Sequence, residues 1–343
     1  MNISLKNSIG LLLAASTALS LAGCAPVAEN TQSALPTIVA TTNVWADVAQ
    51  QVAGDNFEVV ALISDPAQDP HSYEASARDQ LAVAESSMFI MNGGGYDDFA
   101  LTLASAAGVT PFNVFEIHEA DHASHAETGH TEGEHAHEGE HAHEGEHAEP
   151  GHTEGEHAHG EGHAEEGHDH AHGHDGSDHI WYDFHVAEKI AMVLAAEFAK
   201  LQPESSEEFT ANAEAFQADL APIEVRRDSL AGELNYFEAH PLAALLFKEL
   251  GFTNVTPEGF AEAEEAEIEP SVAIVADAEA LIASGTLSFI AMNEQVTSQT
   301  LESLIGKAEA ASIPVLKLQE LLPPGMSYQE WANSVLDQIE SVR

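Results

Sequence analysis

Three histidines, two outside a long histidine-rich tract and one at its far edge, could together form a metal site. They are His71 in DPAQDPHSYE, His179 in SDHIWYD and His240 in NYFEAHPLAALL. His71 and His240 each follow a strand-like run, and ligands of parallel α/β sheets usually bind beyond the carboxyl ends of the strands. Neutral imidazole suits Zn²⁺, for which three protein ligands plus a carboxylate or a water complete a four-coordinate site. The three residues are therefore candidate metal ligands, although a lone histidine is more often a surface or structural residue.

Most histidines belong to a single tract, from His118 to His179, which holds 18 of the 21. The tract has no Lys or Arg and repeats itself, since GHTEGEHAH occurs at 129–137 and again at 151–159. Because it has so few apolar residues, we expect a disordered insert over 118–178. Its paired imidazoles and glutamates could chelate metal, but closing a disordered chain around an ion costs conformational entropy. We expect a low-affinity, multi-ion metal collector; the alternative is a solvated acidic segment with no such role.

The charge of the chain restricts its partners. The 343 residues include 58 acidic and 10 basic side chains, a formal net charge of −48. Only 19 of the acids lie between Glu116 and Asp178, so the acidity also extends through the rest of the chain. This balance argues against nucleic acid or an anionic membrane surface as a partner and favours cations.

The N-terminus has the pattern of an export signal. Lys6 precedes a short apolar stretch that ends in Leu21-Ala22-Gly23-Cys24, and this LAGC sequence resembles the bacterial lipobox. We therefore expect a signal peptide over 1–23, lipidation of Cys24 and no disulfide, because Cys24 is the single cysteine. Residues 24–36 are expected to form a flexible tether. An ordinary signal peptide with an incidental cysteine is the alternative.

Between these segments, strand-like and helix-like patterns alternate. The alternation predicts mostly parallel sheets covered by helices. Strands are expected at 37–42, 57–63, 112–117, 235–239, 287–293 and 313–318, and 88–95 is expected to be a strand that runs into a glycine turn. Helices are expected at 44–54, 97–107, 184–201, 205–232, 271–284, 298–310 and 328–342, with one more that ends near 86 and one that begins at 241. The fold class is α/β, with two small α/β lobes joined by one long rigid helix that contains Pro222. The boundaries are 37–204 for the N-terminal lobe, 205–232 for the linking helix and 233–343 for the C-terminal lobe.

The three histidine segments resemble those of a known family. DPHSYEASARDQLAVAESSMFIMNGGGYDDF is similar to its DPHxYE segment and the helix, strand and turn that follow. SDHIWYD resembles PHVWxD, and EAHPLAALLFKELGF resembles HxxxxYxxxxxGL, with Gly251 at the family's offset from His240. From Thr37 to the C-terminus, apart from the repeat, the chain is similar to the metal-binding lipoproteins of ABC transporters for zinc or manganese.

The resemblance implies a metal site in the cleft between the lobes, with His71, His179 and His240 as ligands. In the family, the fourth ligand is a carboxylate from the C-terminal lobe or a water. In LKLQELLPPG, Gln319 stands at the usual aspartate position and Glu320 is adjacent. Because the two segments can be aligned in two ways that differ by one residue, Glu320 is the candidate fourth ligand, weaker than the three histidines. The alternative is that Glu320 is a solvated loop residue and a water is the fourth ligand.

The resemblance further implies a high-affinity extracytoplasmic receptor that delivers Zn²⁺ to an ABC permease and ATPase. Three nitrogens and at most one oxygen favour Zn²⁺ as the bound ion, with Mn²⁺ as the alternative. We expect no enzymatic activity, a monomer, and a location in the periplasm or, through a lipid on Cys24, on the outer face of the cell membrane. The alternatives are a metal-dependent adhesin, a metal buffer or a zinc hydrolase. A hydrolase would use Glu320 or Asp69 as the base, but the sequence has no HExxH motif. The acidic stretch 261–269 is expected to be a solvated surface.

Deleting 119–176 tests the role of the insert. If the insert collects metal weakly, the deletion should lower the number of zinc equivalents bound in calorimetry but leave the tight site intact. A deletion protein that still binds every equivalent of the parent would contradict the collector.

Overall fold

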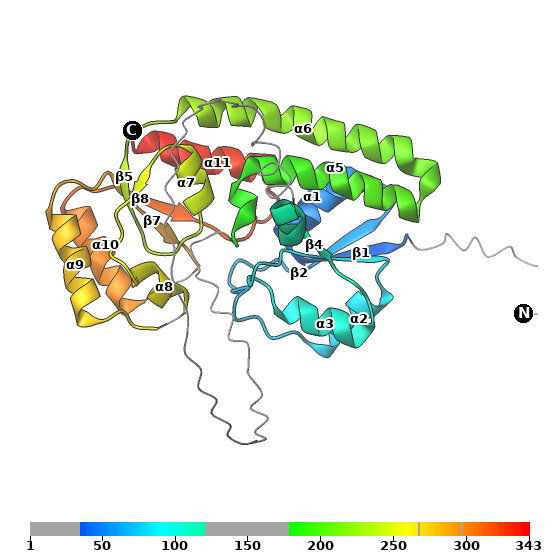
Figure 1. Cartoon of the computed structure of the whole chain (residues 1–343), viewed down its shortest axis with the longest axis horizontal. Coiled ribbons are helices and arrows are strands. Elements are labelled where there is room, and N and C mark those ends of the chain that lie inside the picture. Colours follow the sequence, from blue (N-terminus) through cyan, green and yellow to red (C-terminus); the bar gives the residue numbers. More distant parts are fainter. Residues whose placement is uncertain (1–34, 121–177, 267, 296–297) are drawn as a thin grey trace, which may run out of the picture. The chain divides into compact units, whose positions relative to one another are not determined.

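The computed structural model describes residues 35–120, 178–266, 268–295 and 298–343 (Figure 1). Residues Leu35–Arg343 group into one compact unit. The expected signal peptide, Cys24, and almost all of the tether and the insert lie outside the described residues. Among the helices that are described, none has the length and apolar character needed to span a membrane.

The first lobe contains a four-stranded parallel sheet. Its strands are β1 (Thr37–Thr42), β2 (Glu58–Ile63), β3 (Met88–Met91) and β4 (Phe112–Asn113), in the order β2-β1-β3-β4. The run TIVATT forms a central strand because its apolar and β-branched residues are buried almost throughout, as parallel strands with both faces covered require. Helices α1 (Asn43–Ala53), α2 (Ala77–Glu85) and α3 (Phe99–Ala107) connect and cover the strands.

The second lobe repeats this topology. Its strands are β5 (Asn235–Glu238), β6 (Thr253–Asn254), β7 (Phe289–Asn293) and β8 (Val315–Leu318), in the order β6-β5-β7-β8, again all parallel. The helices are α7 (Ala244–Glu249), α8 (Phe260–Glu265), α9 (Val272–Ala283) and α10 (Gln299–Ala310). Two lobes with parallel sheets confirm the predicted fold class.

Long helices join the lobes (Figure 1). α5 (Phe184–Leu201) packs along α6 (Ser206–Ser229), the long linking helix, which accommodates Pro222 in its interior. The last helix, α11 (Tyr328–Ser341), packs against both α6 and α1. At its start, the Tyr328 amide donates to Asp47 Oδ2 at 2.9 Å, and the Tyr328 hydroxyl donates to the Trp181 carbonyl at 2.6 Å. The C-terminal helix therefore ties the second lobe to elements of the first.

Two of the sequence-based expectations are wrong in detail. The strand predicted over 112–117 ends at Asn113, because the Asn113 side chain accepts from the Glu116 amide at 3.2 Å and starts a helix over 114–120. The stretch 261–269 is not wholly a solvated surface: Glu264 in α8 is only 4% exposed, because α8 packs against the lobe.

The strand order indicates at which edge each of the two sheets could bind a ligand. In each sheet the strand order reverses between the two inner parallel strands, β1 and β3 or β5 and β7, and open α/β sheets bind ligands at such switch points, beyond the carboxyl ends of the strands. His71 follows β2 and the buried turn at Asn92 follows β3; His240 follows β5 and Glu320 follows β8. The fold thus supplies candidate side chains from the same kind of edge in both lobes.

Candidate metal centre

His71 lies in the loop between β2 and α2, which hydrogen bonds hold in place. The His71 amide donates to Asp69 Oδ1 at 2.9 Å, and the Ser72 hydroxyl donates to Asp69 Oδ2 at 2.8 Å. Gln295 Nε2, from the second lobe, donates to the Pro66 carbonyl at 2.8 Å. Both oxygens of the Asp69 carboxylate therefore accept hydrogen bonds within the loop. This role does not support the alternative in which Asp69 is the base of a hydrolase.

His179 is fully buried at the start of the turn Ile180–Tyr182. The preceding Asp178 is fixed by Asn92, whose side-chain amide donates to the Asp178 carbonyl at 2.8 Å. The Asp178 carboxylate lies 3.1 Å from His179 Nδ1. Burial alone would lower the pKa of His179, but the charge of Asp178, helped by Glu320 and Glu265, raises it to about 9. With Nδ1 facing Asp178, Nε2 is the nitrogen directed toward the other histidines.

His240 follows β5 and is 3% exposed. Burial, followed by the positive charge that His179 and His71 would carry, holds its pKa well below the usual range. His240 is therefore neutral at physiological pH, the form in which imidazole binds a metal. Nearby on β5, burial raises the pKa of the fully buried Glu238 to about 8.

Glu320 follows β8, is 1% exposed, and is held by three neighbouring side chains. Asn293 Nδ2 donates to its Oε1 at 2.6 Å, the Tyr96 hydroxyl donates to its Oε2 at 3.3 Å, and its backbone amide donates to Gln295 Oε1 at 2.8 Å. Burial raises its pKa to about 7. Glu320 is thus not the solvated loop residue of the alternative reading. The neighbouring Gln319 points elsewhere, donating to Glu294.

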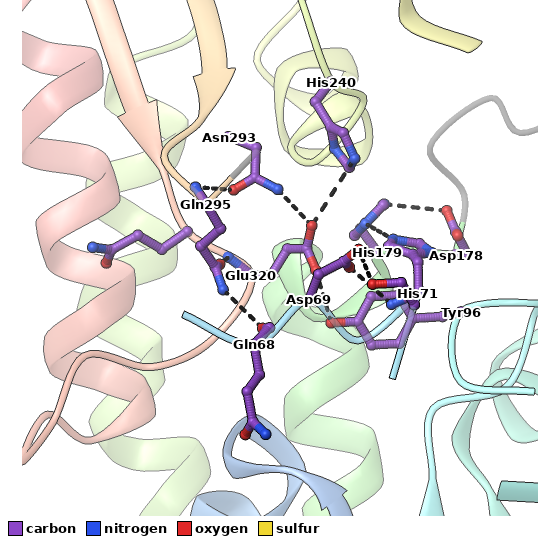
Figure 2. A network of polar contacts seen from close by, with 12 residues as sticks. Gln68, Asp69, His71, Tyr96, Asp178, His179, His240, Asn293, Gln295 and Glu320 are labelled. Carbon is purple, nitrogen blue, oxygen red and sulfur yellow. Dashed lines mark hydrogen bonds and ion pairs between the residues drawn. The ribbon is translucent and has the colours of Figure 1, made fainter. Parts of the chain in front are cut away.

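The four residues converge (Figure 2). His71 Nε2 lies 3.4 Å from His179 Nε2, and His240 Nε2 lies 4.0 Å from Glu320 Oε1. The ring centroids of the three histidines are 5.4 to 6.0 Å apart. In a tetrahedral zinc site with Zn–N distances of about 2.1 Å, ligand atoms are about 3.4 Å apart. The potential ligand atoms of His71, His240 and Glu320 lie within 4.8 Å of one another, and those of His71 and His179 meet the same limit, so His71 connects three imidazoles and one carboxylate from four separate segments.

Aromatic rings form part of the surroundings of these groups. The Tyr96 ring packs edge-on against His71 at 4.8 Å between centroids, and the Trp181 ring lies 5.2 Å from that of His179. Both aromatic residues are buried. They limit the orientations of the histidines and exclude water on their side, which strengthens electrostatic interactions within the site.

Several contributing residues were not foreseen from the sequence. These are Tyr96, Asn293, Gln295, Glu238 and Glu265. Asn293 ends a predicted strand, so the rule that parallel strands present ligands at their carboxyl ends could have found it. Asp178 stands in SDHIWYD where the family's PHVWxD has proline, and an acid beside a candidate metal histidine is a recognised partner of such ligands.

Comparisons with solved structures show the same fold. ZnuA, in a crystal structure, is 18% identical to this chain. The match covers 90% of this chain and 98% of the ZnuA chain, with a TM-score of 0.62. The periplasmic zinc-binding protein TroA from Treponema pallidum is 18% identical, with coverage of 90% and 98% and a TM-score of 0.61. FpvC from Pseudomonas aeruginosa, solved in complex with Mn²⁺, is 17% identical, with coverage of 90% and 100% and a TM-score of 0.60.

The family comparison covers nearly all of the chain. No curated protein matches it. The model of one protein family, however, matches residues 38–342, which include both lobes and all four converging residues. Its members are the periplasmic component of zinc-uptake complexes. The chain belongs to the ZnuA family, zinc-uptake complex component A, periplasmic.

Proposed function

We propose that the protein is a high-affinity extracytoplasmic receptor that captures Zn²⁺ and delivers it to an ABC importer. The metal ligands in this proposal are His71, His179, His240 and Glu320. The observation that carries it is the convergence of three imidazoles and a carboxylate, three of the four at most 3% exposed. A buried group of this kind is costly without a cation to complete it, which is the reason to assign it to metal capture.

The donor set favours zinc as the cargo. Imidazole nitrogen suits Zn²⁺, whereas Mn²⁺ is better served by oxygen ligands, and here nitrogen provides three of the four donors. FpvC, a structural relative, was solved with Mn²⁺, so manganese is the natural competitor to test beside zinc.

Neighbouring side chains orient the proposed ligands for metal binding. Asp178 orients His179 through Nδ1, leaving Nε2 for the metal, as carboxylates behind metal-bound histidines commonly do. Tyr96 and Asn293 hold Glu320 in position from opposite lobes. The site is therefore partly ordered before the metal arrives, which reduces the entropy lost on binding.

The remaining parts of the proposal concern segments outside the described residues. A lipid on Cys24 would hold the receptor at the outer face of the membrane, near the permease that receives the metal. The insert 118–178 would act as a low-affinity collector that raises the local zinc concentration. Both rest on the sequence patterns described above.

Replacing each histidine singly tests the ligand assignment. His71→Ala, His179→Ala and His240→Ala should each weaken the tight zinc site by about 100-fold or more, because each removes one of four donors. Glu320→Gln should weaken it less, by on the order of tenfold, since the amide oxygen remains a poorer donor. Competition with a chelating indicator measures the affinities, and circular dichroism checks the fold. His185→Ala, at an exposed histidine on α5, is the matched control. Tight binding that persists in all three histidine variants would disprove the assignment.

The affinity should also depend on pH, because protons compete with the metal for its ligands. In the metal-free protein the pKa of His179 is about 9 and that of Glu320 about 7. Metal must therefore displace one proton below pH 9 and a second below pH 7. The dissociation constant should rise about tenfold per pH unit between pH 9 and 7 and more steeply below.

The variant Asp178→Asn separates this effect from general unfolding. Without the Asp178 charge the pKa of His179 falls, so the loss of zinc affinity should begin at lower pH than in the parent. An affinity that is constant between pH 5 and 7.5 in the parent would argue against histidine ligation.

A further inference from the structure

The two carboxylate oxygens of Glu320 have different surroundings (Figure 2). Oε1 lies 4.0 Å from His240 Nε2 and accepts a hydrogen bond from Asn293 Nδ2 at 2.6 Å. Oε2 accepts a hydrogen bond from the Tyr96 hydroxyl at 3.3 Å. Oε1 is therefore the oxygen that faces His240, whereas Oε2 is held by Tyr96.

Packing restricts the ring of Tyr96. The residue is 1% exposed, and its ring lies edge-on against those of His71 and Trp181, each 4.8 Å away between centroids. The ring of His179 lies 5.4 Å away. Because close-packed neighbours leave a buried side chain little room to rotate, the hydroxyl stays directed toward Glu320.

The backbone around Tyr96 is held by the turn after β3. The amides of Asn92 and Gly93 donate to the two oxygens of the buried Asp97, at 2.7 and 2.8 Å. The Thr41 hydroxyl donates to the same carboxylate at 2.6 Å, and the Tyr96 amide donates to the Gly93 carbonyl at 3.3 Å. The residues before and after Tyr96 are thus tied together, and the side chain projects from a fixed turn.

The number of oxygens that Glu320 offers bears on the choice of metal. A carboxylate can bind a cation through one oxygen or through both. Zn²⁺ in proteins is most often four-coordinate, so three imidazoles and one oxygen complete its ligand set. Mn²⁺ suits octahedral sites rich in oxygen, so a second carboxylate oxygen would serve it better than it would serve Zn²⁺.

Resting on the proposed function, we propose that Tyr96 is a specificity-determining residue that favours Zn²⁺ over Mn²⁺. Its hydroxyl holds Oε2 of Glu320, so the carboxylate presents only Oε1 to the ion. Without this hydroxyl, Oε2 would lose its hydrogen bond while remaining buried, and such an oxygen is stabilised by joining the cation. Tyr96 does not bind the metal; it is a positioning residue that acts through Glu320.

The dissociation constants for Zn²⁺ and Mn²⁺ test this role in the full chain. Titrations with chelator-buffered metal give both constants for the parent, for Tyr96→Phe and for the control Tyr182→Phe, all in one buffer. The Tyr182 hydroxyl donates to the Gln319 carbonyl at 2.9 Å, so the control removes a hydrogen bond to the backbone of the same loop and keeps the contact with the carboxylate. Circular dichroism checks the fold.

Tyr96→Phe should raise the affinity for Mn²⁺ about tenfold, the scale of one hydrogen bond to a charged group, and change that for Zn²⁺ by less than about threefold. The preference for Zn²⁺ over Mn²⁺ should therefore fall severalfold, whereas Tyr182→Phe should keep the preference of the parent. In a Glu320→Ala background, adding Tyr96→Phe should leave the preference unchanged, because the hydroxyl then has no carboxylate to hold. If Tyr96→Phe does not fold, Tyr96→Leu, which also lacks the hydroxyl, carries the comparison.

Co²⁺ gives an independent reading of the number of ligands. Four-coordinate Co²⁺ absorbs visible light more strongly than five- or six-coordinate Co²⁺. The parent loaded with Co²⁺ should show the strong bands of a four-coordinate ion. Tyr96→Phe should show weaker bands, because Glu320 adds its second oxygen to the ion.

Four results would overturn the inference. The first is a parental preference for Zn²⁺ in folded Tyr96→Phe, and the second is cobalt bands of equal strength in that variant and the parent. The third is the same loss of preference in Tyr182→Phe, which would reduce the effect to a loosened loop. The fourth is a loss of preference that Tyr96→Phe still causes in the Glu320→Ala background. A parent protein that binds neither metal tightly would instead overturn the proposed function, and the inference with it.

Discussion

The arrangement of the site depends on one constraint: three imidazoles and a carboxylate are brought within a few ångströms of each other, largely out of water. Burial raises the pKa of Glu320 to about 7 and holds that of His240 well below its usual range, whereas the pKa of His179, which burial alone would lower, rises to about 9 because of the charge of Asp178. A polar group buried without a partner costs free energy. The hydrogen bonds that Asn293 and Tyr96 donate to Glu320, and the ion pair between Asp178 and His179, offset part of this cost. A divalent cation offsets the rest, and this is the physical basis for capture.

The fold meets this constraint by presenting ligands from matching edges of two similar lobes. The Glu320 loop is held from both sides: Gln295 accepts from its amide, and Asn43 of α1 exchanges two hydrogen bonds with Leu322. Gln295 also donates to the backbone of the His71 loop, so one amide side chain connects two ligand loops. Together with the packing of α11 on α1 and α6, these contacts connect the loops of the two lobes that carry the proposed ligands.

The sequence predicted the alternation of elements, the long linking helix and the three histidine segments, because these depend on local periodicity and on motifs that resemble a family. It supported Glu320 only weakly against a solvated loop residue, since the choice depends on whether the loop after β8 turns this side chain inward toward Asn293 and Tyr96. The acidic run 261–269 was interpreted as surface because composition does not distinguish Glu264, bonded to Ser298, from its exposed neighbours. The strand expected at 112–117 was wrong because the Asn113 side chain favours a helix start over further extension.

The most direct test of the central claim is a crystal structure of the zinc-loaded protein with anomalous scattering recorded on both sides of the zinc absorption edge. The account predicts one strong zinc peak bonded to His71, His179 and His240 at about 2.0–2.1 Å, with an oxygen of Glu320 as the fourth ligand at about 2.0–2.2 Å. A zinc peak that lacks any of the three histidines, or that lies elsewhere in the lobes while these side chains remain unbound, would contradict it.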